Sequence, residues 1–260
     1  MNVKKLLNYT QVFFNFTAVK QLINPKEIPF IILNFNQLET LKELVNFAIS
    51  KSFRKIVIID NASTYMPLLE YYNEIKDKVA VEHMAENYGP TVFMERDEIY
   101  NKYAKGFFIL TDSDITPNEK LPKNFLRVLL KHLLLKYNKV TKVGFALDIE
   151  TIPNYYPAKD KVLKWESQFW KSKIEDHVYY ANIDTTFALY KPNPKKRFKK
   201  RTDHLWALRI AGNFTSKHGG WYIDYNNLSE EQEFYLKTTS KSSSWVIKDG
   251  KTNQEDYNLQ

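Results

Sequence analysis

Two aspartates spaced two positions apart carry the clearest chemical signal in this chain. Residues 107–114 read Phe-Phe-Ile-Leu-Thr-Asp-Ser-Asp, so an apolar run ends directly at Asp112 and Asp114. The apolar run predicts a buried, parallel strand, and open α/β sheets bind ligands just beyond the carboxyl ends of such strands. Paired carboxylates suit Mg²⁺ or Mn²⁺, which such sites share with substrate phosphates. The structural alternative is an Asp-Ser-Asp loop that caps a helix.

Other polar residues follow two further apolar runs upstream. Residues 28–33 predict a strand that ends at Asn34 and Asn36, and residues 55–60 predict a strand that ends at Asp60. A carboxylate at a strand end can accept hydrogen bonds from a ribose hydroxyl or a base N–H. The alternative for Asp60 and Asn61 is a turn with Asx capping.

The elements that position these residues alternate between strand and helix. After the first strand, apolar residues at helical spacing predict a helix over residues 38–48. A short third strand is expected at 79–82, and a turn at 86–90 begins a helix that continues to about residue 103. The fourth strand is the run at 107–110. This alternation predicts an α/β fold with a parallel, doubly wound sheet flanked by helices.

Four segments in this order resemble a known family. Ile-Pro-Phe-Ile-Ile-Leu-Asn-Phe-Asn, Ile-Val-Ile-Ile-Asp-Asn-Ala-Ser, Asn-Tyr-Gly-Pro and Ile-Leu-Thr-Asp-Ser-Asp resemble the nucleotide-sugar-binding half of GT-A glycosyltransferases, and are most similar to family 2. The resemblance covers roughly residues 26–150. It implies a Rossmann-like, mostly parallel sheet and a variable C-terminal half that binds the acceptor.

The resemblance also implies roles for individual residues. The loop after the first strand and the end of the second would contact the base and ribose, with the turn at 86–90 nearby. Asp114 would hold the metal against the donor diphosphate, and Asp112 would lie near the ribose or the metal. The implied nucleotide-sugar-binding residues are Asn34, Asn36, Asp60, Asn61, Asn87, Gly89, Asp112 and Ser113.

The C-terminal half departs from the family pattern. We expect a helix at 124–137, a strand at 143–147, a loop at 151–160, a helix at 161–171 and a strand at 179–190. The Glu-Asp pair and the Gln-x-x-Arg-Trp type motif of family 2 are absent, so the sequence marks no catalytic base and leaves inverting and retaining chemistry open. An inverting enzyme needs a carboxylate to deprotonate the acceptor.

Three candidates for that base can be ranked. Asp184 is first, because it interrupts an apolar strand where an unpaired carboxylate is costly to bury; its alternative is satisfaction by neighbouring threonines. Glu166 is second, because Trp165 and Trp170 could stack on a sugar, although core packing explains the tryptophans equally well. Asp148 and Glu150, at another strand end, are third.

A glycine-rich stretch late in the chain predicts a ligand loop. His218 precedes Gly219 and Gly220, two of only seven glycines, and glycine permits close approach of the backbone to a ligand. Several GT-A families complete the metal shell with a late histidine, so the resemblance implies His218 as a third metal ligand beside Asp112 and Asp114. Lys217 and Arg209 are cations that could bind the diphosphate. The alternatives are a surface histidine and solvated side chains.

A basic segment runs from Lys195 to Arg201 and contains six Lys or Arg residues. The chain as a whole carries a net charge of +8. Such a run indicates a loop that meets an anion: an anionic membrane surface, a phosphorylated or lipid-diphosphate-linked acceptor, or nucleic acid. The alternative is a solvated loop with no partner. We expect no nucleic-acid partner, because the basic residues cluster in one loop instead of spreading along a face.

Composition bounds the remaining possibilities. At 260 residues with 43% hydrophobic content, the chain can form one large domain or slightly more. We expect an N-terminal helical arm (1–27), a nucleotide-sugar-binding subdomain (28–150), an acceptor-binding subdomain (151–240) and a tail (241–260). No apolar run reaches about 18 residues, and no signal peptide is evident. With no cysteines, a cytoplasmic location is expected, including peripheral membrane contact.

The sequence therefore predicts a glycosyltransferase that uses Mn²⁺ or Mg²⁺ to move a sugar from a nucleotide donor to a glycan or lipid-linked acceptor, as in surface polysaccharide synthesis. Two alternatives remain. A sugar-phosphate nucleotidyltransferase would need a glycine-rich loop after the first strand, where residues 34–37 contain no glycine. A basic nucleic-acid-binding module would show no metal-linked nucleotide affinity.

Overall fold

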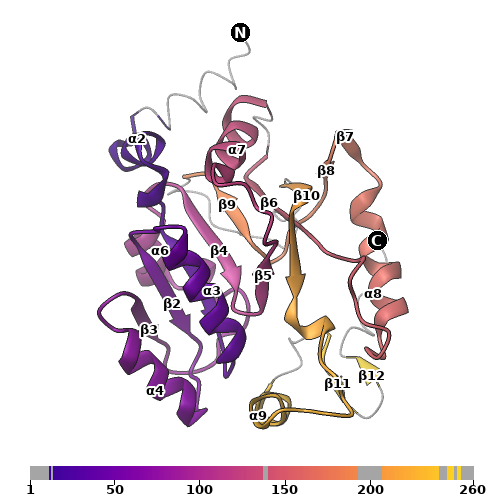
Figure 1. The fold of residues 1–260 in the computed structure, drawn as a ribbon. Helices are drawn as coiled ribbons and strands as arrows, with labels where there is room; N and C mark the ends of the chain where they lie inside the picture. The colour runs from indigo at the N-terminus through magenta and orange to yellow at the C-terminus, as the bar shows by residue number, and fades with distance from the viewer. Residues whose placement is uncertain are drawn as a thin grey trace.

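The computed structural model describes residue 12 and residues 14–136, 140–192, 207–239, 245–248 and 251–252. Its central feature is a mixed sheet of 10 strands in the order β3-β2-β1-β4-β9-β6-β10-β8-β7, with β5 paired to β10. Helices pack on the sheet (Figure 1), and the predicted α/β class is confirmed.

The first four large strands are parallel neighbours, as predicted. They are β1 (Phe30–Asn34), β2 (Ile56–Asp60), β3 (Ala80–His83) and β4 (Phe108–Asp112). The register aligns Asn34 with Asp60 and Leu33 with Asp112. The polar residues that end these strands therefore lie along one edge of the sheet, which we call the carboxyl edge.

Both faces of β1, β2 and β4 are covered, which is why these three strands are nearly continuous apolar runs, whereas β3 is only partly buried. Phe30 and Ile32 face a core with α3 (Glu39–Ser50), α4 (Met66–Ile75) and α7 (Phe125–Lys131). Ile31 and Leu33 face a second core with α5 (Val92–Glu95) and α6 (Asp97–Tyr103). The helix expected after residue 90 is thus two short helices.

The second half of the sheet joins the first through one short strand. β9 (Ala188–Tyr190) is antiparallel to β4 on one side and to β6 (Lys142–Leu147) on the other. β10 (Ala207–His218) runs parallel to β6, so its end also lies at the carboxyl edge. β5 (Ile115–Pro117) pairs antiparallel with the end of β10.

Three expected elements differ in the structure. The strand expected at 179–190 is instead β8 (Val178–Tyr180), a connecting segment and β9, because β8 pairs with β10 while β9 pairs with β4 and β6. The ligand loop expected around residues 209–222 is mostly the long strand β10, followed by η5 (Gly219–Trp221). The expected helix at 124–137 is α7 continued by the π-helix η2 (His132–Lys136).

The remaining elements flank the sheet. α2 (Phe16–Ile23) and η1 (Pro25–Glu27) precede β1, and Gln21 of α2 both donates to and accepts from the backbone of Phe107 at the start of β4. α8 (Lys159–Glu166) and η3 (Ser167–Trp170) lead to β7 (Lys173–Glu175), while β11 (Ile247–Lys248) pairs with β12 (Lys251–Thr252). Within the described ranges, no helix has the length and apolar character needed to cross a bilayer.

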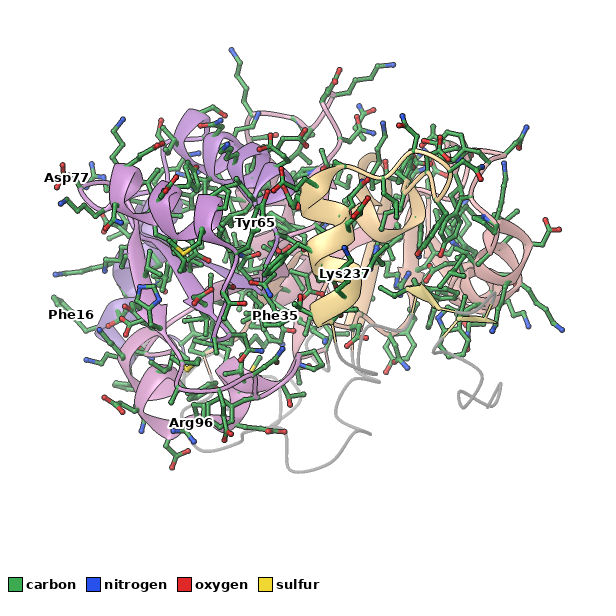
Figure 2. The ribbon with its side chains drawn as sticks, turned by 90° about the horizontal axis from the view of Figure 1, so that it is seen from below. Phe16, Phe35, Tyr65, Asp77, Arg96 and Lys237 are labelled. Atoms are coloured by element: carbon green, nitrogen blue, oxygen red, sulfur yellow. The ribbon has the colours of Figure 1, made fainter. Side chains whose placement is uncertain are left out.

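A late helix reaches back to the first half of the chain. α9 (Glu230–Thr238) begins with a capping box between Ser229 and Gln232. Figure 2 shows α9, marked by Lys237, beside the segment that carries Tyr65, and the rings of Tyr65 and Phe234 are 5.1 Å apart. Residues 65 and 234, far apart in the sequence, therefore meet at the carboxyl edge.

Candidate active site

Asp114 and His218 meet where β5 and the end of β10 pair at the carboxyl edge. The Oδ2 atom of Asp114 is 3.4 Å from Nδ1 of His218. The backbone N–H of Gly219 donates to the Asp114 carbonyl at 2.7 Å, and the His218 ring stacks on Trp221 with centroids 5.1 Å apart. The strand pairing and the stacked tryptophan thus fix the imidazole against the carboxylate.

The two glycines after His218 are needed for this close packing. A Cβ atom on Gly219 would stand 3.1 Å from Cβ of Asp114, and one on Gly220 would stand 3.1 Å from Cε1 of His218. Both distances are tighter than ordinary contacts. The two glycines therefore allow the backbone to pack closely against the side chains of Asp114 and His218.

The pair fits one metal ion. Nδ1 of His218 is buried and has no hydrogen-bond partner, and an orphaned buried nitrogen is costly unless something binds it. Two ligands at about 2.1 Å in neighbouring octahedral positions lie about 3 Å apart, close to the observed separation. An imidazole nitrogen favours Mn²⁺, a transition metal, over Mg²⁺, which takes oxygen ligands.

The third expected metal ligand, Asp112, is held differently. Its Oδ2 atom accepts a hydrogen bond from Thr185 Oγ1 at 2.5 Å, and its N–H donates to the Thr185 carbonyl at 2.9 Å. Among the residues that the structure describes, no three metal-binding side chains of the His, Cys, Asp or Glu type come together. The structure therefore brings together two of the three residues and places Asp112 next to them.

Electrostatics at this corner disfavour a third negative charge. Burial, then the neighbouring Asp114, and to a lesser degree Asp184, raise the pKa of Asp112 well above its usual value, while the Thr185 hydroxyl acts in the opposite direction. Three carboxylates thus lie within electrostatic reach of one another. A divalent cation would relieve their repulsion.

Asp184 lies close to this corner, but not in the expected strand. It belongs to the segment 181–187, which connects β8 to β9, and its side chain is exposed. The reason is topological: each flanking strand has only three residues and a different partner. The cost of burying a carboxylate, which pointed to Asp184, therefore does not apply. Its position next to Thr185 and Asp112 does place it at the site.

Glu166 and Arg209 form a buried ion pair with each other instead. The Arg209 guanidinium donates to Glu166 at 2.6 Å, with the two side chains only 5% and 3% exposed. Arg209 also lies over the Phe169 ring at 4.0 Å. The expectation that Glu166 is a base and Arg209 a diphosphate ligand is not supported, because a buried ion pair leaves neither group free. The tryptophans pack as well: Trp165 against Phe169 and Trp170 against Tyr179.

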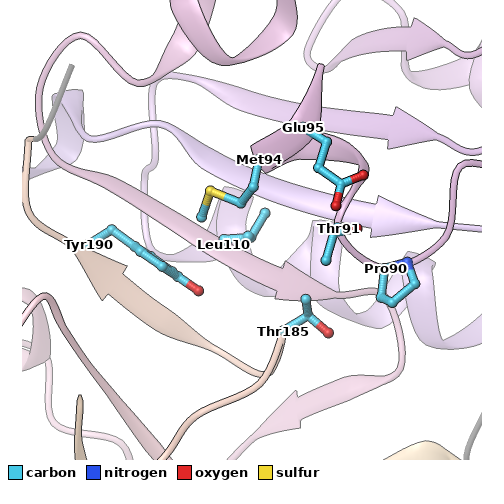
Figure 3. A pocket seen from close by; sticks show the side chains of 7 residues that line it. All are labelled: Pro90, Thr91, Met94, Glu95, Leu110, Thr185 and Tyr190. Atoms are coloured by element: carbon cyan, nitrogen blue, oxygen red, sulfur yellow. The ribbon is translucent and has the colours of Figure 1, made fainter. Parts of the chain in front are cut away.

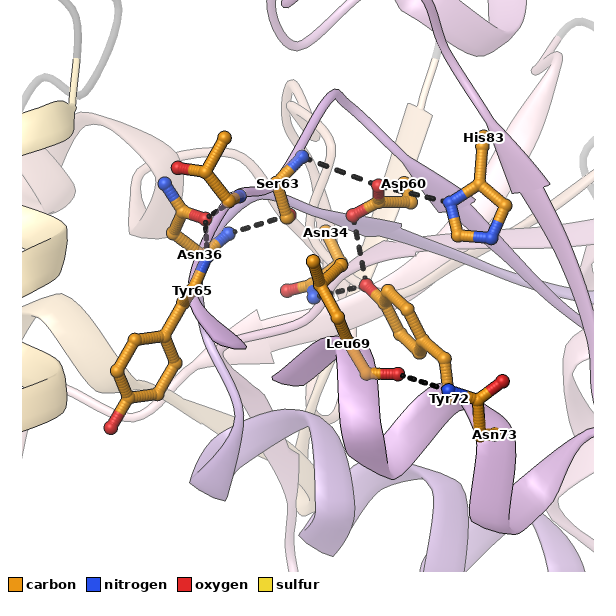
Figure 4. Close-up of polar contacts among 10 residues, drawn as sticks. Asn34, Asn36, Asp60, Ser63, Tyr65, Leu69, Tyr72, Asn73 and His83 are labelled. Carbon is orange, nitrogen blue, oxygen red and sulfur yellow. Dashed lines mark hydrogen bonds and ion pairs between the residues drawn. The ribbon is translucent and has the colours of Figure 1, made fainter. Parts of the chain in front are cut away.

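Side chains at the ends of β1 and β2 form a polar network (Figure 4), in which only the Asn34 Oδ1 atom is buried without a hydrogen-bond partner. The Tyr72 hydroxyl donates to Asp60 Oδ1 at 2.9 Å and accepts from Asn34 Nδ2 at 2.8 Å. Asp60 Oδ2 accepts from the Ser63 N–H at 3.2 Å and lies 3.3 Å from Nδ1 of His83. Burial and Asp60 raise the pKa of Tyr72. The Asx capping weighed as the alternative for Asp60 is present, because its carboxylate accepts from the N–H three residues on.

Asn36 and Asn61 shape the adjoining loops. Asn36 has a φ of 51° and accepts from the N–H groups of Thr64 and Tyr65 at 2.7 and 3.1 Å. Asn61 Nδ2 donates to Asn87 Oδ1 at 2.8 Å and to the Gly89 carbonyl at 3.0 Å. Gly89 has a φ of 79°, which favours glycine. These side chains hold the loop that faces the carboxyl edge.

Two other expected site residues, Ser113 and Lys217, make few contacts that bear on the site. Ser113 is buried and donates to Gln37 at 2.8 Å. Lys217 is exposed, with its ammonium 5.5 Å above the Tyr222 ring.

The basic segment from Lys195 to Arg201 lies outside the described residues. Its flanks are described: Tyr190 and Ala207 both pair with Lys142, at the start of β6, which is the edge opposite the site.

A small recess adjoins Thr185 (Figure 3). Its volume of about 30 Å³ leaves room for a small group. Residues from α5, β4, β9 and the two neighbouring loops line it, namely Pro90, Thr91, Met94, Glu95, Leu110, Thr185 and Tyr190.

Sequence reasoning missed three residues at the site. Thr185 holds Asp112, Tyr72 holds Asp60, and Trp221 supports His218. The Gly-Gly-Trp sequence offered a local signal for Trp221. Tyr72 had none, because a buried hydroxyl in a helix reads only as part of an apolar face.

Comparisons with known proteins give similarities of fold at low sequence identity. No protein-family model matches the chain, and no curated protein matches it. The structure is similar to the mannosyltransferase PcManGT from Pyrobaculum calidifontis in complex with GDP-Man and Mn²⁺, with a TM-score of 0.44, 11% identity, and coverage of 90% of this chain and 71% of that one. It is also similar to S. aureus TarS 1–349, with a TM-score of 0.44, 14% identity, and coverage of 75% of this chain and 60% of that one.

Proposed function

We propose that this protein is a metal-dependent glycosyltransferase that moves a sugar from a nucleotide-sugar donor to an acceptor hydroxyl. One observation carries the proposal: a carboxylate and a buried imidazole nitrogen that has no hydrogen-bond partner lie 3.4 Å apart at the carboxyl edge of a mixed sheet whose strands β1, β2, β4, β6 and β10 all end there. This edge is where open α/β sheets bind nucleotides and similar ligands.

Asp114 and His218 would hold Mn²⁺ or Mg²⁺, with Asp112 beside them. When bound, the metal would act as a Lewis acid that neutralises charge on the departing nucleoside diphosphate. The two hydrogen bonds between Thr185 and Asp112 keep Asp112 oriented toward the same corner. The ammonium of Lys217, which is exposed and one residue before His218, would supply a cation to the diphosphate.

Asp184 is the candidate general base for an inverting reaction. Its exposed carboxylate can accept a proton from an acceptor hydroxyl. It lies beside the group formed by Asp112, Asp114 and His218, which we call the metal corner. Asp148 is less suited to the role, because its carboxylate accepts from the N–H of Glu150 and from the backbone and hydroxyl of Thr151. In a retaining reaction Asp184 would not be needed as a base.

The nucleotide would bind over the ends of β1 and β2. Asn34 and Asp60 are buried, so they would support the loops around the nucleotide without contacting it. Asn87 is exposed and could contact the ligand directly. The finer parts of the proposal rest on the sequence: a glycan or lipid-linked acceptor, a role in surface polysaccharide synthesis, a cytoplasmic location, and contact between residues 195–201 and an anionic membrane.

A thermal-shift panel tests the proposal. Wild-type protein is titrated with UDP-, GDP-, CMP- and dTDP-sugars, with and without Mn²⁺. A ligand at 100 times its dissociation constant stabilises by about 2.7 kcal/mol, which is several degrees for a chain of this size. Asp114→Asn and His218→Ala should abolish the metal-linked part of the shift. Asp77→Asn, an exposed carboxylate beyond α4, is the matched control and should behave as wild type.

Each outcome separates the alternatives. A shift with one nucleotide class that requires metal and is lost in both variants supports the proposal. A nucleotidyltransferase would respond to a nucleoside triphosphate and a sugar phosphate instead. A metal-independent response to nucleic acid alone would contradict the proposal in favour of a binding module.

A further inference from the structure

Lys142 is a fully buried lysine whose side chain reaches the segment that carries Asp184, and the mechanism above does not use it. It is the first residue of β6, and its side chain is 0% exposed. An ammonium in the interior is costly unless hydrogen-bond acceptors surround it. The position of those acceptors therefore shows what the lysine does.

The acceptors belong to the segment that carries Asp184. Lys142 Nζ donates to the Ile183 carbonyl and lies 3.5 Å from the Asp184 carbonyl oxygen and 3.3 Å from the Tyr190 hydroxyl. The Nε atom of Arg209 donates to the Asn182 carbonyl at 2.6 Å. Two buried cations thus hold three successive carbonyl groups of one connecting segment.

This segment links the interior to the metal corner. It begins at the opposite edge of the sheet, where the Ala181 N–H donates to Ala207, and it reaches the carboxyl edge at Thr185. Thr185 then binds Asp112 through its hydroxyl and its carbonyl. A shift of residues 182–184 would therefore move the Asp184 carboxylate and the groups that orient Asp112 together.

We propose that Lys142 is a positioning residue that fixes the segment 182–185, so that Asp184 and Thr185 stand in register with Asp112 at the metal corner. The inference rests on the proposed function for the role of Asp184, but not for the placement of the segment. Burial lowers the pKa of Lys142 to about 7, with Asp184 opposing and Arg209 adding to that effect. Both the ammonium and the neutral amine retain N–H donors, so the contact does not depend on the protonation state.

Lys142→Met tests the proposal, because methionine fills similar volume without a donor. In hydrogen–deuterium exchange, we expect the amides of peptides covering 108–114 and 182–187 to exchange about tenfold faster or more, with the rest of the sheet unchanged. Lys26→Met is the matched control, since Lys26 donates to the Lys51 carbonyl away from the site. It should leave exchange in both peptides as in wild type.

Kinetics give a second readout. With the donor identified, kcat of Lys142→Met should fall by about 10²-fold while KM for the donor changes by less than about threefold, because small displacements of reacting groups cost rate more than binding. If Lys142→Met does not fold, Lys142→Gln, which keeps an N–H donor, should show smaller changes of the same kind.

Two results would overturn the positioning role: unchanged exchange in both peptides, or an equal increase over the whole sheet, which marks a merely structural lysine. A loss of kcat/KM that comes from a higher KM alone, with kcat unchanged, would also contradict it. The exchange measurement needs no activity. A wild-type chain without transfer activity would therefore refute the proposed function and leave the exchange result as the test of Lys142.

Discussion

The carboxylate of Asp60 is surrounded by hydrogen-bonding groups from the protein itself. Tyr72, the Ser63 backbone and His83 all approach it, and the side chain of Asp60 is almost inaccessible. A ligand that bonded this carboxylate directly would have to displace His83, the one exposed member of the set. The protein's own groups thus hold the Asp60 carboxylate at the ends of β1 and β2.

The buried amine of Lys142 should make stability depend on pH. Burial lowers its folded-state pKa to about 7, against about 10.4 in an unfolded chain. Between these values the unfolded chain binds more protons, so the free energy of unfolding rises with pH, by up to about 1.4 kcal/mol per pH unit.

Urea denaturation of wild type and Lys142→Met at pH 7, 8 and 9 measures this effect. Methionine does not titrate, so the difference in unfolding free energy between the two proteins should move in favour of wild type as pH rises. A difference that stays constant across this range would show that the amine is not desolvated as the structure indicates.

At the level of strands, β6 and β9 approach unusually closely at Gly144. A Cβ atom there would stand 2.2 Å from the Phe187 carbonyl oxygen and 2.9 Å from Cα of Ala188. Both neighbours are backbone in the middle of the sheet and cannot move aside separately. We expect Gly144→Ala to destabilise the protein by about 3 kcal/mol or to prevent folding.

Gly89→Ala provides the comparison for Gly144. No atom lies within 4 Å of a Cβ at that position, but its φ of 79° is unfavourable for alanine, so the cost should be only about 1–2 kcal/mol. Chemical denaturation of both variants checks the order. Equal losses would mean that strand proximity at Gly144 is not the source of its effect.

The elements that the sequence predicts well are those with local signals. Strands β1, β2 and β4 are apolar on both faces and are followed by polar residues, so their positions and their shared edge could be predicted. β8 and β9 could not, because each has three residues and depends on partners far away in the chain.

The site divides in the same way. Asp114 was identifiable from its place after an apolar strand, and the resemblance to a known family pointed to His218. That the two lie 3.4 Å apart depends on the pairing of β5 with β10, which no local pattern specifies. Glu166 and Arg209 looked available because the sequence does not show that they are buried against each other.

Across the whole molecule, α9 connects the C-terminal part of the described chain to the start of α3. Glu231 Oε1 accepts from the N–H of Leu38 at 2.7 Å, and its carboxylate also accepts from Glu39. These groups begin α3, whose own N-cap residue makes no side-chain cap. A residue of α9 therefore supplies the cap, next to the Asn36–Thr238 hydrogen bond.

Removing this carboxylate should loosen two distant segments together. Glu231→Ala should lower the free energy of unfolding by about 1 kcal/mol, the usual cost of losing a helix cap. Hydrogen exchange should increase both at the start of α3 and in α9. The exposed neighbour Glu230 is the control, and Glu230→Ala should leave α3 unaffected. An increase confined to α9 would contradict the capping role.

The position of β9 has a consequence for how the protein is made. The ribosome delivers β4 (Phe108–Asp112) and β6 (Lys142–Leu147) well before the strand that lies between them in the sheet. Until Ala188–Tyr190 has emerged, both earlier strands present unpaired edges, which are prone to pair with other chains. The sheet of the nascent protein therefore cannot be completed between β4 and β6 until the three residues of β9 have been synthesised. A chaperone that binds these unpaired edges would act during the synthesis of residues 148–190.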